Sequence, residues 1–337
     1  MKPTYILLGA DGYYGRNFQF YLSELDYNFI SIDKNIPDDF YSSFPIENHL
    51  LDYIRCDLSD KDCVKRITDL IEFFKDEVIV VNFAAISFVD YSIIHPEETI
   101  NNNVKCCING YKLSKHFNSS KYIYISTDEV RVNKEENELS PYVISKRKCE
   151  EFLKSKGFYR QSLKSQPSDN IYILRPVNLM DVITPIKGLK QKQRCLLNNI
   201  ADSILSNSLD SSKSSVKLHV GTQKRMFMSM KTACKLLIEI DDYVPHSYPE
   251  EDDLIKIVDV VDIPSLRTSD LPIHDIVYFL HYVYRFKVDE VPNPRGVYQD
   301  ESYLNVYGNV KIDEKWNINS YKMILNAVEK ILKIKMK

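Results

Sequence analysis

The stretch Gly9-Ala10-Asp11-Gly12-Tyr13-Tyr14-Gly15 decides the fold that we predict for this chain. It follows a short apolar run, residues 4–8, whose composition suits a parallel strand buried on both faces. It precedes an amphipathic stretch, residues 16–25, with helical periodicity. Only nine glycines occur in 337 residues, and three of them fall within these seven positions. A strand, a glycine-rich turn and a helix in this order predict a turn whose backbone N–H groups hold a pyrophosphate.

The same alternation of apolar runs and helical stretches continues along the first half of the chain. We expect strands at residues 28–33, 77–84, 121–126 and 171–174, and helices at residues 60–75, 97–117 and 140–156, the last closed by Gly157. This pattern predicts an α/β fold with a doubly wound parallel sheet of the Rossmann type. After residue 176 the alternation weakens, so we place a smaller C-terminal substrate domain there.

The length fits two domains of about 100–200 residues each. We predict a dinucleotide-binding domain at residues 1–176, to which residues 226–262 return. Residues 177–225 and 263–337 then form the substrate domain, with helices near 196–205, 273–284 and 320–334.

The charge and the cysteines exclude several classes of protein. With 44 Lys and Arg against 47 Asp and Glu, the net charge of −3 supplies no positive field to attract nucleic acid or an anionic membrane. No signal peptide is apparent, and no apolar run approaches the ~20 residues of a membrane span, so we expect a cytoplasmic protein. The seven cysteines lack CxxC spacing, which predicts reduced, mostly buried thiols and no metal site.

Asp33 ends the second expected strand, 18 residues after Gly15. A carboxylate at this place accepts hydrogen bonds from both ribose hydroxyls of NAD and repels the 2′-phosphate of NADP. The neighbouring Lys34 favours the opposite choice, because a cation accommodates that phosphate. We therefore expect NAD, with NADP as the alternative.

Tyr142 and Lys146 stand four residues apart, on one face of an expected helix. A nearby ammonium stabilises a phenolate and lowers the pKa of a tyrosine from its usual ~10. Such a pair suits proton transfer, although a surface Tyr–Lys pair has the same spacing. The pair follows the strand expected at residues 121–126, downstream of the glycine turn, and this place favours the catalytic interpretation.

Three further segments carry a resemblance to a known family: Asp57-Leu58, the run Asn82-Phe83-Ala84-Ala85-Ile86-Ser87-Phe88-Val89-Asp90-Tyr91-Ser92, and Asn103-Val104. Together with the glycine turn and the Tyr–Lys pair, and in this order, they make the sequence similar to the extended short-chain dehydrogenase/reductase family. This family contains NAD-dependent nucleotide-sugar epimerases and dehydratases. The resemblance implies NAD as cofactor, a UDP- or dTDP-hexose as substrate, and a homodimer.

The resemblance also implies which residues bind. For NAD they are Gly9, Gly12, Tyr13, Tyr14, Gly15, Asp33, Asp57, Leu58, Ala84, Ala85, Ser87, Asn103, Tyr142 and Lys146. For the substrate they are Ser87, Asn178, Arg225 and Arg295. Arg175, like Arg225 and Arg295, stands in a segment that resembles a family motif, and we expect these three arginines to offer bidentate phosphate contacts.

Residues 126–130 read Ser-Thr-Asp-Glu-Val and resemble the corresponding stretch of dTDP- or UDP-glucose 4,6-dehydratases. In that case Tyr142 removes the proton of the sugar 4-hydroxyl as a hydride passes from C4 to NAD. Thr127 holds the oxygen, and Lys146 tunes the phenol.

Two acids would complete the dehydration. Glu129 takes the C5 proton, and Asp128, kept protonated, donates to the departing 6-hydroxyl, because two close carboxyls separate their pKa values. Residues 131–132 and 179–181 depart from the dehydratase pattern. They keep open a nucleotide-sugar 4-epimerase or a 4-keto-sugar epimerase/reductase, which needs no acid pair. An NAD-bound scaffold without catalysis is the third alternative.

Overall fold

A computed structural model of the chain describes residues 2–35, 49–71, 77–158, 170–183, 196–209, 215–219, 224–244, 255–268, 270–291 and 314–336. The chain divides into two compact units. The first comprises Met1–Val130, Leu139–Arg175 and Cys234–Asp259, and the second comprises Arg131–Glu138, Pro176–Ala233 and Val260–Lys337.

The first unit is built on one seven-stranded sheet. Its strands are β1 (Thr4–Leu8), β2 (Phe29–Asp33), β3 (Leu50–Arg55), β4 (Val78–Asn82), β5 (Lys121–Ile125), β6 (Asn170–Arg175) and β11 (Ile255–Asp259). They lie in the order β11-β6-β5-β4-β1-β2-β3, and each neighbouring pair is parallel. Every residue of β1 and β4 is buried, as expected for central strands covered on both faces. The predicted doubly wound parallel sheet is confirmed.

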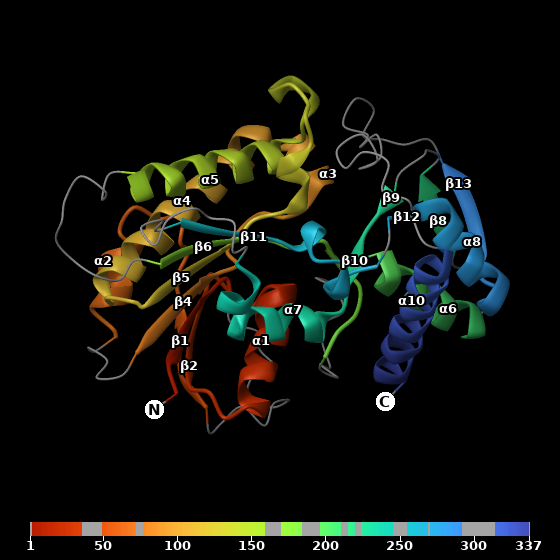
Figure 1. Cartoon of the computed structure of the whole chain (residues 1–337), viewed down its shortest axis with the longest axis horizontal. Coiled ribbons are helices and arrows are strands. Elements are labelled where there is room, and N and C mark those ends of the chain that lie inside the picture. The colour runs from red at the N-terminus through yellow and green to blue at the C-terminus, as the bar shows by residue number, and fades with distance from the viewer. Residues whose placement is uncertain are drawn as a thin grey trace. The chain divides into compact units, whose positions relative to one another are not determined.

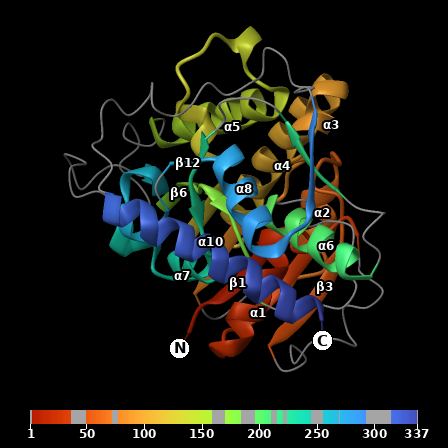
Figure 2. The same ribbon diagram turned by 90° about the vertical axis from the view of Figure 1, so that its right-hand side faces the viewer.

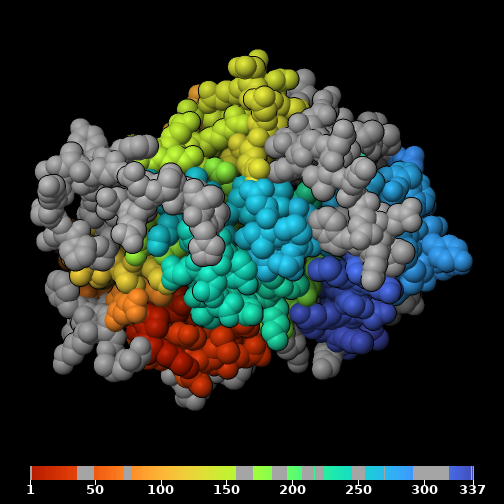
Figure 3. All heavy atoms as spheres, in the orientation of Figure 1, coloured from red at the N-terminus to blue at the C-terminus, as the bar shows by residue number. Residues whose placement is uncertain are grey.

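Helices cover both faces of this sheet. They are α1 (Tyr13–Glu24), α2 (Cys63–Thr68), α3 (Val89–Ile94), α4 (Pro96–His116), α5 (Pro141–Phe158) and α7 (Met230–Ile238), with short 3₁₀ helices η1 (Asp128–Arg131) and η4 (Ile240–Tyr243). Helices α4 and α5 lie on one face, and α1 and α7 lie on the other (Figure 1). In the space-filling view, the atoms of α1 and of α7 from Cys234 onward adjoin one another on this second face (Figure 3).

The order of the strands creates a crevice. From β1 the chain moves outward through β2 and β3, and then returns to place β4 on the other side of β1. The connections that follow β1 and β4 therefore run in opposite directions, which leaves a crevice at the carboxyl ends of these two strands. The glycine turn follows β1, so the topology brings it to this crevice.

The second unit contains short strands and three longer helices. The strands are β7 (Asn178–Leu179), β8 (Ser215–His219), β9 (Lys224–Arg225), β10 (Phe227–Met228), β12 (Leu271–Pro272) and β13 (Lys287–Val291). The helices are α6 (Leu196–Leu209), α8 (Ile273–Tyr284) and α10 (Glu314–Lys335), with 3₁₀ helices η2 (Glu136–Glu138), η5 (Val260–Asp262) and η6 (Pro264–Leu266). Figure 2 shows α10 running past α6 and α8, and the three helices share a buried apolar core.

Some expected features differ from the structure. The helix expected at residues 60–75 is shorter, because α2 ends at Thr68. Gly157 does not close α5, which continues to Phe158.

Six cysteines are buried free thiols, whereas Cys195 lies outside the described residues. Within the described ranges there is neither a cluster of side chains suited to a metal ion nor a helix with the length and apolar character of a membrane span.

Candidate active site

The glycine turn packs backbone against backbone. Gly9 has a φ of 77°, in the left-handed region, and a Cβ added there would lie 2.6 Å from both the Cα and the N of Ala84. A Cβ on Gly15 would lie 2.7 Å from the carbonyl oxygen of Gly9. Gly12 is the residue that precedes α1. A side chain at Gly9 would push the turn away from the segment that follows β4, and one at Gly15 would push α1 away from the turn. The glycines therefore let the N-terminus of α1 open directly onto the crevice.

Asp33 is held in place by main-chain donors. Its Oδ2 accepts a hydrogen bond from the N–H of Asp11 at 2.9 Å, and its Oδ1 accepts one from the N–H of Asn35 at 3.0 Å. These two hydrogen bonds fix the orientation of the carboxylate at the end of β2. Both Asp33 and the exposed Lys34 line the cavity described next.

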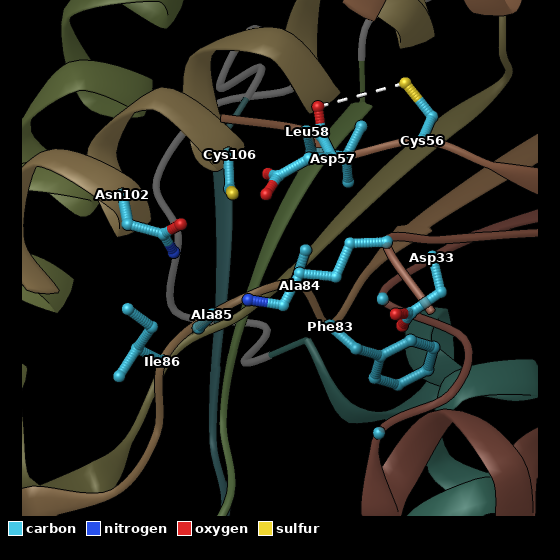
Figure 4. A pocket seen from close by; sticks show the side chains of 13 residues that line it. Asp33, Cys56, Asp57, Leu58, Phe83, Ala84, Ala85, Ile86, Asn102 and Cys106 are labelled. Carbon is cyan, nitrogen blue, oxygen red and sulfur yellow. Dashed lines mark hydrogen bonds between the residues drawn. The ribbon is translucent and has the colours of Figure 1, made fainter. Parts of the chain in front are cut away.

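A cavity lies at the carboxyl ends of these strands, with about 510 Å³ of empty space including the part open to solvent. Its lining is shown in Figure 4 and comprises Gly9, Gly12, Asp33, Lys34, Cys56, Asp57, Leu58, Phe83, Ala84, Ala85, Ile86, Asn102 and Cys106. The carboxyl of Asp57 is fixed by the N–H and the hydroxyl of Ser59, both at 2.8 Å. Seven residues expected to bind NAD therefore line one cavity.

Six lining residues were not among the expected NAD contacts. One is Lys34, and the other five are Cys56, Phe83, Ile86, Asn102 and Cys106. Four of these five adjoin expected contacts in the sequence, so a wider window around each motif would have included them. Cys106 is different, since it reaches the cavity from the third turn of α4, with its sulfur visible in Figure 4. Nothing in its sequence neighbourhood indicated that position.

Other expected NAD contacts support the cavity without lining it. The ring of Tyr14 packs on that of Phe83, with centroids 5.0 Å apart. Asn103 accepts from the N–H of Ile86 at 2.7 Å and donates to its carbonyl at 3.1 Å, so it fixes the backbone of the wall. Tyr13 and the exposed Ser87 are not among the lining residues described.

Tyr142 and Lys146 lie in the first half of α5. Lys146 is 3% exposed, and its Nζ donates a hydrogen bond to the carbonyl of Ile125 at 2.6 Å. Nζ also lies 5.9 Å from the centroid of the Tyr142 ring. Burial lowers the pKa of Lys146, because a buried ammonium has lost its water.

Thr127, Asp128 and Glu129 follow β5 and open η1. The hydroxyl of Thr127 lies 3.3 Å from Oδ1 of Asp128, and the N–H of Glu129 points to the same hydroxyl at 3.4 Å. Thr127 and Asp128 are buried, and Glu129 is half-buried. The tight turn thus presents one hydroxyl and two carboxyls in succession at the end of a central strand.

The pKa of Tyr142 is raised above its ordinary value by the chain's own groups. Burial is the largest cause, followed by the charges of Glu129 and Asp128, while a hydrogen bond with Thr127 opposes the rise. The sequence predicted a lowered pKa for Tyr142, and that prediction is wrong, because burial and the two nearby carboxylates outweigh the effects that lower it. The same influences show that Tyr142, Thr127, Asp128 and Glu129 lie close together, with Lys146 one turn along the helix.

Arg175 corrects another expectation. Its Nε and Nη2 donate to Oε1 and Oε2 of Glu150 at 2.9 and 2.5 Å, and its Nη1 lies 3.4 Å from Asp259. The expected bidentate geometry is therefore present, but the partner is a buried carboxylate of α5 and not a phosphate. Glu150 also accepts from the hydroxyl of Ser126 at 2.7 Å. Arg175 joins β6, α5 and β11.

The expected substrate residues lie mainly in the second unit. Asn178 donates from its backbone N–H and its Nδ2 to the carbonyl of Met226, at 3.1 and 3.3 Å. Arg225 is 7% exposed, and its Nη1 donates to the carbonyl of Lys224 at 2.9 Å. Arg295 lies outside the described residues.

Solved structures with this fold cover almost the whole chain. A UDP-glucose 4-epimerase from Thermotoga maritima shares 15% identity at a TM-score of 0.67, covering 99% of this chain and 100% of that one. A UDP-N-acetylglucosamine 4-epimerase from Methanobrevibacter ruminantium shares 19% identity at a TM-score of 0.67, with 99% of each chain covered. The NAD-dependent NDP-hexosamine 5,6-dehydratase TunA shares 15% identity at a TM-score of 0.65, covering 99% of this chain and 98% of that one.

A search of curated protein sequences finds no match. The model of the NAD dependent epimerase/dehydratase family, in contrast, matches residues 5–239, which include the glycine turn, the cavity and the Tyr–Lys pair. The sequence motifs, the parallel sheet and this match agree, and the chain belongs to the NAD-dependent epimerase/dehydratase family.

Proposed function

We propose that the chain is an NAD-dependent nucleotide-sugar 4,6-dehydratase, which converts a UDP- or dTDP-hexose into a 4-keto-6-deoxy sugar nucleotide. The observation that carries this proposal is the pair of carboxyls, Asp128 and Glu129, gathered at the phenol of Tyr142. Oxidation at C4 needs one base, which Tyr142 provides. Removal of water from C5 and C6 needs a further base and a further acid, and the acid pair offers both.

The residues at the cavity fit NAD. The backbone of the glycine turn has no side chain in the way of a pyrophosphate, and the carboxylate of Asp33 would accept hydrogen bonds from a ribose diol. Asp57 and Leu58 line the same cavity. NAD held there would supply the acceptor for a hydride from C4 of the sugar and the donor of a hydride to C6.

The chain's own residues then move the protons. Tyr142 takes the proton of the 4-hydroxyl, with Thr127 donating a hydrogen bond to the same oxygen and Lys146 supplying positive charge beside the phenol. The ketone formed at C4 makes the C5 proton acidic, and Glu129 removes it. Asp128, which is buried, acts as the acid in this step and gives a proton to the 6-hydroxyl, which leaves as water. The loss of C5–H and C6–OH leaves a C5–C6 double bond. Glu129 then returns its proton to C5, while a hydride added at C6 would complete the reduction.

A nucleotide-sugar 4-epimerase is the second candidate function, favoured by the structural similarity to two UDP-sugar 4-epimerases. It would use Thr127, Tyr142 and Lys146 in the same way at C4. It would make no use of Asp128 and Glu129 as a proton donor and acceptor. The two candidates therefore differ in what the acid pair does.

The test is to incubate the purified protein with NAD and with UDP-glucose, dTDP-glucose or their N-acetyl relatives, and to analyse the products by mass and NMR. A product that lacks one water and carries a C4 ketone supports the dehydratase. A C4 epimer of unchanged mass supports the epimerase, and no conversion with NAD bound supports a scaffold.

A variant assigns the dehydration step. Glu129→Gln should lower the rate of water elimination by about 10²-fold or more. It should retain oxidation at C4, seen as absorbance of reduced nicotinamide. Glu97→Gln is the matched control, because Glu97 is an exposed acid in the first turn of α4, and it should leave turnover unchanged. Equal loss of both half-reactions in Glu129→Gln would contradict the assigned role.

A further inference from the structure

The ammonium of Lys146 lies over a second tyrosine ring, which belongs to Tyr124. Nζ is 4.7 Å from the centroid of this ring and 5.9 Å from that of Tyr142. Tyr124 is 1% exposed and stands on β5, next to Ile125, whose carbonyl accepts the hydrogen bond from Nζ. The ammonium is therefore bounded by one carbonyl and by the faces of two rings. Only the Tyr142 ring follows from the sequence spacing.

A buried ammonium needs such neighbours, because water does not stabilise it. The titratable groups around Lys146 are the thiols of Cys106, Cys107 and Cys149 and the carboxyl of Glu150. Burial raises the pKa of Cys106 to about 12 and that of Cys107 well above its usual value, so these two thiols carry no charge near neutral pH.

The other two groups, the thiol of Cys149 and the carboxyl of Glu150, also bind partners other than Lys146. A hydrogen bond with Cys107 lowers the pKa of Cys149, whose Sγ also lies 3.5 Å from the carbonyl of Asn103. Glu150 is paired with Arg175. The ring of Tyr124 adds a neutral, permanent attraction for the cation, through the negative face of its π-system. Burial raises the pKa of Tyr124 as well, so the ring stays neutral over the working pH range.

We propose that Tyr124 is a positioning residue for Lys146, whose ring face holds the ammonium charged and in place beside Tyr142. Its catalytic meaning rests on the proposed function, whereas its effect on Lys146 does not. The ring face of Tyr124 is the part that lies against the ammonium of Lys146. Tyr124→Phe keeps this face and should therefore retain the effect.

The test is an NMR titration of the full-length protein with lysine labelled by ¹³C at Cε, in which the Lys146 signal is identified by its loss in Lys146→Arg. Tyr124→Phe should keep the wild-type midpoint. Phenylalanines with increasing numbers of fluorines at position 124 keep the shape of the ring and weaken its negative face. The midpoint should fall stepwise along this series, by about one pH unit in total.

The same fluorinated series at Tyr122 is the matched control. Tyr122 is a buried tyrosine two residues earlier on the same face of β5, and its hydroxyl binds Asn82 and the carbonyl of Cys107. That series should leave the Lys146 midpoint unchanged. A constant midpoint in the position-124 series, or an equal fall in both series, would overturn the proposal.

A second readout links the effect to catalysis. With a nucleotide sugar that the protein converts, the decline of kcat at alkaline pH should move to lower pH by the same amount as the titration midpoint. A fixed alkaline decline beside a shifted midpoint would overturn the catalytic part. If no sugar is converted, the proposed function fails, and the titration still decides the positioning role.

Discussion

We expect the affinity for NAD to depend most directly on Asp33. Its two oxygens are oriented by the N–H groups of Asp11 and Asn35 toward the cavity. Asp33→Asn removes the charge and turns one acceptor into a donor, so we expect the Kd for NAD to rise by about 10-fold or more. Calorimetric titration of NAD and NADP measures this, and the preference for NAD should shrink.

Lys34→Gln is the control for this change. Lys34 is exposed and lines the same cavity, and we expect less than about a threefold change in NAD affinity for a solvated charge of this kind. Unaltered NAD binding in Asp33→Asn would show that the ribose does not contact this carboxylate.

Tyr142 should titrate at lower pH once the acid pair is neutral. The charges of Glu129 and Asp128 raise its pKa, and the hydrogen bond with Thr127 lowers it. The double variant Asp128→Asn, Glu129→Gln therefore lowers the pKa of Tyr142, and Thr127→Val raises it. NMR of the protein with ¹³Cζ-labelled tyrosine follows both shifts. A rise of the Tyr142 pKa in the double variant, or a fall in Thr127→Val, would contradict the placement of these groups beside the phenol.

At the level of single residues, the sequence indicates neighbours along a helix better than neighbours across the fold. The i, i+4 spacing places Lys146 beside Tyr142 wherever α5 forms. The direction of the pKa shift depends on Glu129 and Asp128, which reach the phenol from the end of another element. Arg175 shows the same limit, since its partner Glu150 lies 25 positions away on α5.

At the level of elements, long periodic segments are predictable and short ones are not. The helix expected at 97–117 is α4, Pro96–His116, and the strand expected at 121–126 is β5, Lys121–Ile125. Strands of two residues such as β9 and β10 leave no periodicity to read. Their pairing is decided by partners distant in the sequence.

Gly110 shows how closely α4 approaches the sheet. An added Cβ would lie 2.4 Å from Nδ2 of Asn82 and 2.9 Å from the hydroxyl of Tyr122. Gly110→Ala should therefore lower the free energy of unfolding by about 1–3 kcal/mol, although alanine favours helices. Urea denaturation measures the change. Asn101→Ala, at an exposed position of α4, is the control and should change stability by less than about 0.5 kcal/mol.

Arg175 connects three elements, and its loss should be costly. Burial would raise the pKa of Glu150, but the hydrogen bond and charge of Arg175 hold it below its ordinary value. Arg175→Met removes the bidentate partner of this buried carboxylate and leaves it with the hydroxyl of Ser126 and the ammonium of Lys154, 3.5 Å away. We therefore expect a loss of about 3 kcal/mol at pH 7. Lys65→Ala breaks an exposed pair with Asp69 and should cost less than about 1 kcal/mol.

The pH dependence gives a second check on this pair. A depressed folded pKa stabilises the protein above the ordinary carboxyl pKa, and this stabilisation is lost as the pH falls through the folded pKa. In Arg175→Met burial raises the pKa of Glu150, so the gap in stability between wild type and variant should begin to narrow above about pH 4.3 and should close as the pH falls through the folded pKa of the wild type. A gap that is constant with pH would mean that the loss comes from packing and not from the charge.

At the level of the whole molecule, the alternation of strands and helices was enough to predict the parallel sheet. The second unit was harder to predict, because the strand pairs in its described part join segments such as β8 and β13 that are far apart in the sequence. The homodimer stays a prediction, which equilibrium sedimentation tests by a mass of twice the 39.4 kDa chain.

The central claim is that a hydrogen at C4 of a nucleotide sugar leaves with its electrons, beside Tyr142, and returns to C6 of the same molecule. The most direct measurement uses UDP-glucose or dTDP-glucose carrying deuterium at C4, with NMR of the product. The account predicts a 4-keto-6-deoxy product with the deuterium in its C6 methyl group. Deuterium that stays at C4, in an epimer or in unchanged sugar, would contradict it.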